Sequence, residues 1–144
     1  MSEGGYNTNL ASEFYVMSVL YRLGLEPHLT LGNKKSVDIA VIHGPGRALT
    51  IDVKAVAAKN DWFVSAPTSE PRTRHFVVLV SYEGRFNVPQ EIPRCWIMPA
   101  SDLLGLVQKS KKGSAYFVKR KDILRMGKAF EDAWHVLMTT DYQQ

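Results

Sequence analysis

The sequence has one cysteine in 144 residues, and this scarcity excludes several kinds of site. Cys95 has no second cysteine for an internal disulfide, and no CxxC or Cys/His spacing surrounds it. We therefore expect a reduced, buried thiol, with neither a zinc site nor cysteine-based catalysis. The four histidines also lack ligand spacing, and we expect each to be structural or exposed: His28, His43, His75 and His135.

Long apolar runs and several well-known catalytic motifs are missing as well. No run approaches the roughly 18 apolar residues of a membrane span, and residues 1–6 do not combine a cationic start with an apolar core. We expect no membrane partner and a cytoplasmic location. The chain has no GxSxG and no GxxxxGK[ST] motif, which argues against a serine hydrolase and a P-loop enzyme. It has no internal repeat, so we expect one domain over residues 1–144.

Positive charge is concentrated toward the end of the chain. The formal net charge is +4, and eight of the 18 Lys and Arg residues lie between positions 109 and 128, where Asp122 is the one acid. A basic face on this expected helical part, 101–138, indicates a polyanion as partner, and an ordinary solvated surface is the alternative. The eight residues are Lys109, Lys111, Lys112, Lys119, Arg120, Lys121, Arg125 and Lys128.

Proline and glycine divide the remaining sequence into short elements. We expect a helix over 9–23 closed by Gly24, a helix from Ser101 as its cap to about 108, and an amphipathic helix over 122–138. One face of this last helix carries Ile123, Phe130, Trp134 and Leu137. The expected strands cover 37–42, 49–53, 62–64, 76–82, 95–98 and 115–118, with 76–82 buried on both faces and 115–118 at an edge. This order predicts an α/β domain with a mixed central sheet.

The stretch VDIAVIHGPGRALTIDVKA, residues 37–55, reads as a hairpin whose two strands each carry an acid. If the loop is 43–47, Ile42 lies opposite Ala48. The same register places Asp38 opposite Asp52, so that the two carboxylates are neighbours.

Side chains alternate along a strand, which puts Asp52 and Lys54 on one face of this hairpin and Leu49, Ile51 and Val53 on the other. Opposed like charges destabilise a sheet, and burial adds a desolvation cost. We expect a cation between the acids: Lys54 supplies one positive charge, and a divalent metal with oxygen ligands would supply more. A solvated sheet face with a nearby lysine is the alternative.

The first helix adds a third acid. At about 100° per residue, Glu13 falls inside the arc of apolar residues rather than on the polar side. A carboxylate on the core side needs a partner such as Lys54, a capping amide or a water held by a metal. A glutamate that reaches solvent from the edge of the arc is the alternative.

These residues resemble the PD-(D/E)XK nuclease superfamily, which has the restriction-endonuclease-like fold. SEFYVMSVLYRLG matches the family's helix with its glutamate, VDIAV its first acid and IDVKA its second acid and lysine, so the resemblance spans 9–55. Val37 stands where the family often has proline, and Asp52 where glutamate is commoner. The resemblance implies a core order α-β-β-β-α-β, a mixed sheet flanked by helices.

The resemblance also implies a catalytic set of Glu13, Asp38, Asp52 and Lys54. Asp38 and Asp52 would hold Mg²⁺, or Mn²⁺ in its place, together with the backbone carbonyl of Val53. Glu13 would bind through a water or a second metal. Lys54 would orient or help deprotonate the attacking water and stabilise the charged transition state.

Nucleic-acid contacts are expected outside this set. Trp62 follows the second acid strand and is a candidate for stacking on bases, although its strand setting also suits core packing. The candidate phosphate contacts are cationic, with a simple polar loop or surface as the alternative: Arg72, Arg74, Lys111, Lys112, Lys119, Arg120 and Lys121.

The sequence thus predicts a metal-dependent endonuclease, with DNA as the expected substrate. One alternative is a structure-specific enzyme of the Holliday-junction-resolvase kind, which would need a homodimer built from edge strands or the aromatic last helix. Another is a non-catalytic nucleic-acid-binding module, against which the opposed acids argue because they repel a polyanion. A partner protein that supplies specificity is a further expectation.

Overall fold

The computed structural model describes residues 3–30, 38–67 and 72–138, and this part of the chain forms two sheets and three α-helices. The helices are α1 (Glu3–Arg22), α2 (Ala100–Leu104) and α3 (Arg120–Met126), followed by the 3₁₀ turns η1 (Lys128–Phe130) and η2 (Trp134–Leu137). The strands are β1 (Pro27–Leu29), β2 (Ile39–Gly44), β3 (Arg47–Val56), β4 (Trp62–Val64), β5 (His75–Ser81), β6 (Arg94–Pro99), β7 (Val107–Lys109) and β8 (Tyr116–Val118). Among the described helices, none has the length and apolarity that crossing a membrane requires.

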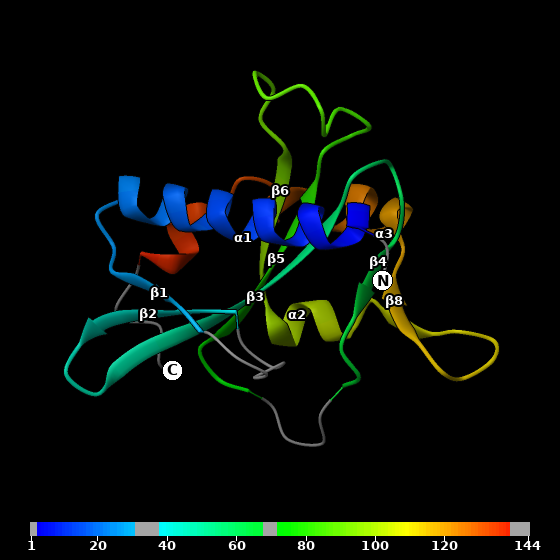
Figure 1. Cartoon of the computed structure of the whole chain (residues 1–144). Coiled ribbons are helices and arrows are strands. Elements are labelled where there is room, and N and C mark those ends of the chain that lie inside the picture. The colour runs from blue at the N-terminus through cyan, green and yellow to red at the C-terminus, as the bar shows by residue number, and fades with distance from the viewer. Residues whose placement is uncertain (1–2, 31–37, 68–71, 139–144) are drawn as a thin grey trace.

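The larger sheet has five strands in the order β1-β2-β3-β5-β6, and the smaller has three in the order β4-β8-β7 (Figure 1). In the larger sheet β3 and β5 run parallel, and the other neighbours are antiparallel. The expectation of a mixed sheet flanked by helices is therefore confirmed. Every residue of β5 is buried, as the continuous apolar run 76–82 predicts for a central strand.

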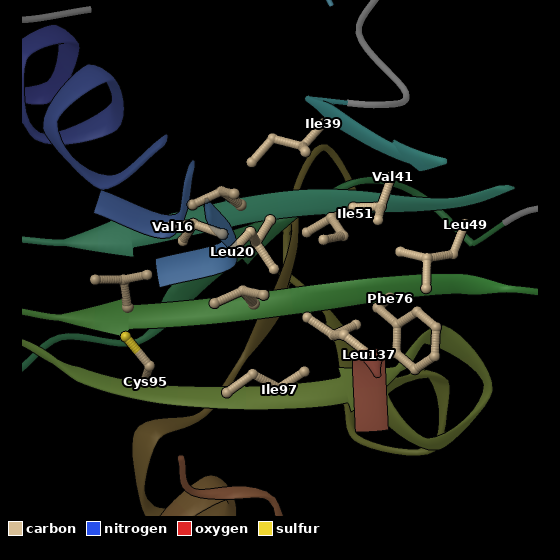
Figure 2. Packing of buried hydrophobic residues seen from close by; sticks show 13 residues of the cluster. Val16, Leu20, Ile39, Val41, Leu49, Ile51, Phe76, Cys95, Ile97 and Leu137 are labelled. Atoms are coloured by element: carbon tan, nitrogen blue, oxygen red, sulfur yellow. The ribbon is translucent and has the colours of Figure 1, made fainter. Parts of the chain in front are cut away.

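Two hydrophobic clusters cover opposite faces of the larger sheet. On one face, residues of α1 and η2 pack on β2, β3, β5 and β6, and Figure 2 shows Val16, Leu20 and Leu137 over these strands. On the other face, the cluster joins β5 and β6 to α2, α3 and the smaller sheet. Alternation along β3 places Leu49, Ile51 and Val53 in the first cluster, as expected, and leaves Asp52 and Lys54 to the second face.

Helix α1 begins six residues before the expected start, at Glu3 instead of Asn9. Gly4 and Gly5 are poor helix formers, so propensity alone disfavours this first turn. Tertiary contacts outweigh it: the buried Ser12 donates a hydrogen bond to the Thr8 carbonyl (2.7 Å), and its hydroxyl lies 3.2 Å from that of Tyr82.

Gly24 ends α1 as predicted. It has φ 84°, a backbone conformation that costs glycine little, and the Leu25 N–H donates to the Leu20 carbonyl at 3.1 Å. The chain then enters β1, an edge strand that the sequence reading had placed in a loop.

The expected helix over 122–138 is wrong. It breaks at Gly127, whose N–H closes α3 on the Ile123 carbonyl, and the chain continues as η1 and η2. The break is stabilised from the sheet, because Glu131 forms a bridge with Trp96 and a two-pronged ion pair with Arg94.

Three further elements differ from expectation. Residues 82–93 connect β5 directly to β6, so the helix expected between the third and fourth core strands, α2, follows β6 instead. Helix α2 ends at Leu104, its N-cap is Pro99 rather than Ser101, and 107–109 is a strand. Strand β8 is the middle strand of its sheet and not an edge, because β4 and β7 pair with it on both sides.

The contact between α3 and the sheet contains a charged network. Arg120 donates to both oxygens of Glu83, at 2.7 and 2.8 Å, and Ser81 and Arg94 also contact Glu83. The pKa of Glu83 is lowered to about 2, first by its hydrogen bond with Arg120. A carboxylate held in this way stabilises the fold wherever it is ionised.

Leu20→Ala should lower the free energy of unfolding by about 2–5 kcal/mol, because it leaves a cavity at a fully buried position between α1 and the sheet. Phe14→Ala on the same helix is the control, since Phe14 is exposed and we expect a change within about 0.5 kcal/mol. Urea denaturation measures both. Equal effects of the two substitutions would contradict the placement of α1.

Acid should weaken the wild type more than Glu83→Gln. The pKa of Glu83 lies below its ordinary value of 4.5, so its stabilisation is complete above that pH and is lost as pH falls toward about 2. Urea denaturation at pH 6, 4.5 and 3 should show the difference between wild type and variant shrinking. Glu91→Gln, at a solvent-exposed ion pair with Arg85, should show almost no such difference at any pH.

Candidate active site

The candidate site lies where β2 begins and β3 continues without it. The two strands pair from Ile42 opposite Ala48 to Ile39 opposite Ile51, the register that the sequence predicts. Asp38, the next residue, donates its N–H to the Ile51 carbonyl at 2.9 Å. Its carboxylate Oδ2 then accepts the N–H of Val53 at 2.7 Å. A side chain thus replaces the strand partner of β3, and the sheet opens at this point.

A cleft of about 890 Å³ occupies this opening. Its walls come from the first half of α1, from β3, from the segment that leads into β4, and from the loop after β5. The structure brings four of the predicted site positions together here: Glu13, Asp38, Val53 and Lys54 line the cleft. The remaining lining residues are Gly5, Thr8, Asn9, Ala55, Val56, Ala57, Asn60, Asp61, Phe63 and Phe86.

Asp52 lies beside the cleft but is 5% exposed. Its Oδ1 is buried and has no hydrogen-bond partner among the described residues. Burial raises the pKa of Asp52 to about 6; Lys54 opposes this rise and Asp38 adds to it. Buried polar atoms are normally paired, so an orphaned carboxylate oxygen marks a place where a partner is missing.

Glu13 faces the same charges from the opposite wall. Its pKa is raised to about 7, chiefly by burial and then by Asp38, with Lys54 lowering it and Asp52 raising it further. Three acids and one lysine therefore share an electrostatic environment. The expectation that Glu13 leaves the polar side of α1 agrees with its half-buried position on the cleft wall.

His75 joins this group, which the sequence reading missed. The parallel register pairs Thr50 with His75, and the Thr50 hydroxyl lies 2.7 Å from His75 Nδ1. His75 Nε2 is 4.0 Å from Asp52 Oδ2. Burial lowers the pKa of His75 to about 4, so the imidazole is neutral at pH 7 and does not compensate the Asp52 charge. The signal in the sequence was a polar residue at the start of a buried strand.

Two predicted nucleic-acid contacts are contradicted by burial and pairing. Trp62 is fully buried, its indole N–H donates to the Val80 carbonyl at 3.0 Å, and its ring meets Trp96 edge to face. It cannot stack on a base. Arg120 is 14% exposed in its side chain and is held by Glu83, so it supports the fold instead of meeting a phosphate.

The other predicted cations differ in their surroundings. Arg72 is close enough to lower the pKa of both Asp52 and His75. Arg74 donates its Nε–H to the Ala48 carbonyl at 2.8 Å, which ties it to β3. The remaining three lie on or beside the smaller sheet: Lys111 and Lys112 are exposed in the turn between β7 and β8, and Lys119 and Lys121 flank the start of α3.

The donor set fits a hard divalent cation only in part from side chains. Within residues 3–30, 38–67 and 72–138, no three His, Cys, Asp or Glu side chains converge as a metal-binding group. Two carboxylates and a backbone carbonyl offer oxygen donors, however, and the orphaned Asp52 Oδ1 lacks the positive partner that a cation provides.

Comparison with known proteins identifies a fold. No protein-family model and no curated protein matches the chain. Its structure is similar to that of a bacterial homing endonuclease, I-Ssp6803I, with a TM-score of 0.57 and 15% sequence identity. The match covers 94% of this chain and 93% of that one. The chain therefore has the mixed α/β fold of an endonuclease over nearly its whole length.

Asp52→Asn should stabilise the protein at pH 7.5 in EDTA by about 1–3 kcal/mol, because it removes a buried, unpaired charge. The pKa of Asp52 is raised to about 6 from an ordinary 3.8, so the cost of its charge appears as pH rises through this interval. The gain should therefore nearly vanish at pH 4. Thermal unfolding at the two pH values measures it.

Mg²⁺ should then stabilise the wild type and leave Asp52→Asn unchanged, because only the ionised carboxylate offers a full charge to a cation. Asp102→Asn, an exposed acid in α2, is the control and should respond as the wild type does. A variant Asp52→Asn less stable than wild type in EDTA at pH 7.5 would show that the carboxylate is already compensated.

Proposed function

We propose that this protein is a divalent-metal-dependent endonuclease that hydrolyses phosphodiester bonds of DNA, and that it belongs to the PD-(D/E)XK superfamily. The observation that carries the proposal is the Asp52 carboxylate, buried with one oxygen unpaired, beside Asp38 and Lys54 at an open cleft. A fold shared with a bacterial homing endonuclease supports it. The order of Glu13, Asp38, Asp52 and Lys54 along the chain follows the superfamily pattern.

Asp38, Asp52 and the backbone carbonyl of Val53 would hold the cation, with Mg²⁺ as the expected ion and Mn²⁺ as a substitute. When bound, such an ion acidifies water and neutralises charge that develops on the phosphate. The protein contributes the fixed positions of the donors. Asp38 is oriented by its hydrogen bond from Val53 N–H, and Asp52 by its place within the buried centre of β3.

Lys54 acts on the reacting atoms from the cleft wall. Its side chain lines the cleft, on the same face of β3 as Asp52, and is only partly exposed. An ammonium group in that position orients the attacking water and stabilises the additional negative charge of the transition state. The site needs no covalent nucleophile, because water attacks the phosphorus directly.

Glu13 completes the site from α1. A carboxyl group whose pKa is about 7 exchanges protons readily near neutral pH. Glu13 therefore orients water in the cleft and accepts a proton from it, on the side opposite Lys54. Because the same cleft carries the anionic Asp38, the negative phosphate enters only where positive charge offsets the acids.

Purified protein should cut DNA in Mg²⁺ or Mn²⁺ and not in EDTA. Asp52→Asn and Lys54→Ala should each lower the rate by roughly 100- to 1000-fold, the usual cost of removing one charge-stabilising group. Supercoiled plasmid, linear duplex, single strand, branched DNA and RNA are compared as substrates. Lys59→Ala removes an exposed lysine outside the cleft lining and should cut at the wild-type rate.

The products separate this proposal from its competitors. Symmetric cuts at branch points would indicate a junction-specific dimeric enzyme. Salt-sensitive binding without cleavage, equal in wild type, Asp52→Asn and Lys54→Ala, would show that the acids are not catalytic and that the protein is a binding module.

A further inference from the structure

Strand β4 turns its two aromatic residues to opposite sides. Trp62 is fully buried, and Phe63 is 73% exposed although it is the next residue. Phe63 lies directly opposite Phe117 of β8, so the two side chains share the outer face of the smaller sheet. On this face Phe63 lines the cleft that also holds Glu13 and Lys54.

An exposed apolar side chain is common and by itself unremarkable in meaning. The position of Phe63 is different, because a second aromatic residue from another part of the chain lines the same cleft. Phe86 comes from the loop after β5, and its ring packs edge to face on Tyr82 with centroids 4.8 Å apart. The cleft thus combines aromatic rings with the charged groups of the candidate active site.

The dimensions and chemistry of the cleft suit one nucleotide-sized part of a strand. Its volume of about 890 Å³ falls in the range of small-ligand pockets and is far too small for a duplex. Lys54 offers a cation to a phosphate, whereas the exposed ring offers an apolar face to a base. Aromatic faces stack on any nucleobase, with little dependence on sequence.

We infer that Phe63 stacks on an unpaired base of the strand whose phosphate enters the cleft. The inference rests on the proposed nuclease function for the identity of the phosphate. A base inside a duplex has both faces covered by its neighbours, so stacking on Phe63 requires a single strand, an overhang or a base turned out of the helix. Phe63 is a positioning residue in this account: it sets the register of the strand and leaves the chemistry to the acids and Lys54.

The test measures binding of a fluorescein-labelled single-stranded oligonucleotide to the full chain by anisotropy, in EDTA and at low salt. Phe63→Ala should weaken binding about five- to thirtyfold, as expected for the loss of one stacked base. Phe63→Leu should weaken it similarly, because leucine is apolar but has no π face. Phe63→Trp should bind at least as tightly as the wild type, and blunt duplex should respond little to any of the three.

Phe14→Ala is the matched control, because Phe14 is also an exposed aromatic residue but does not line the cleft. It should bind as the wild type does, and thermal unfolding should be unchanged for all variants at these exposed positions.

Three results would overturn the inference: no binding of single strand by the wild type, wild-type binding by Phe63→Ala, or wild-type binding by Phe63→Leu. The last would show that bulk and not stacking matters. A change in apparent mass on gel filtration with unchanged binding would also overturn it and make Phe63 a protein contact. Binding that depends on Phe63 without any cleavage in Mg²⁺ would support the inference and contradict the proposed function alone.

Discussion

The hydrogen bond from Val53 N–H to the Asp38 carboxylate is the contact on which the candidate site depends. It ends the pairing of β2 with β3 and leaves the rest of β3 without a strand on that side, which creates the cleft. The same register keeps Asp38 beside Asp52 at a cost in desolvation and repulsion. The apolar clusters on both faces of the sheet offset that cost, so the acids stay where catalysis can use them.

Much of this arrangement follows from local sequence. The register of the hairpin comes from the loop 43–47, the placement of Glu13 from helical periodicity, and the end of α1 from Gly24. The shared face of Asp52 and Lys54 follows from strand alternation alone. Such features depend on residues close together in the chain, and the mixed sheet then follows from the order of its elements.

The features that the sequence could not predict depend on distant contacts. His75 meets Asp52 only because β5 lies parallel to β3, and Trp62 and Phe63 face in or out according to which side of β4 packs on the larger sheet. Helical periodicity continues through Gly127, yet the helix stops there because Glu131 pairs with Arg94 and Trp96 across the chain. Pairings of this kind have no local signature.

The bridge between Glu131 and Trp96 has a consequence for how copies of the chain can meet. It covers part of the outer edge of β6, where Asp132 N–H also donates to the Cys95 carbonyl, and the opposite edge is the three-residue β1, which starts with Pro27. Both ends of the larger sheet therefore offer few free backbone groups to an incoming strand. Continuous intermolecular β-structure cannot grow easily from either end, and this protects a chain rich in buried strands against fibrous aggregation.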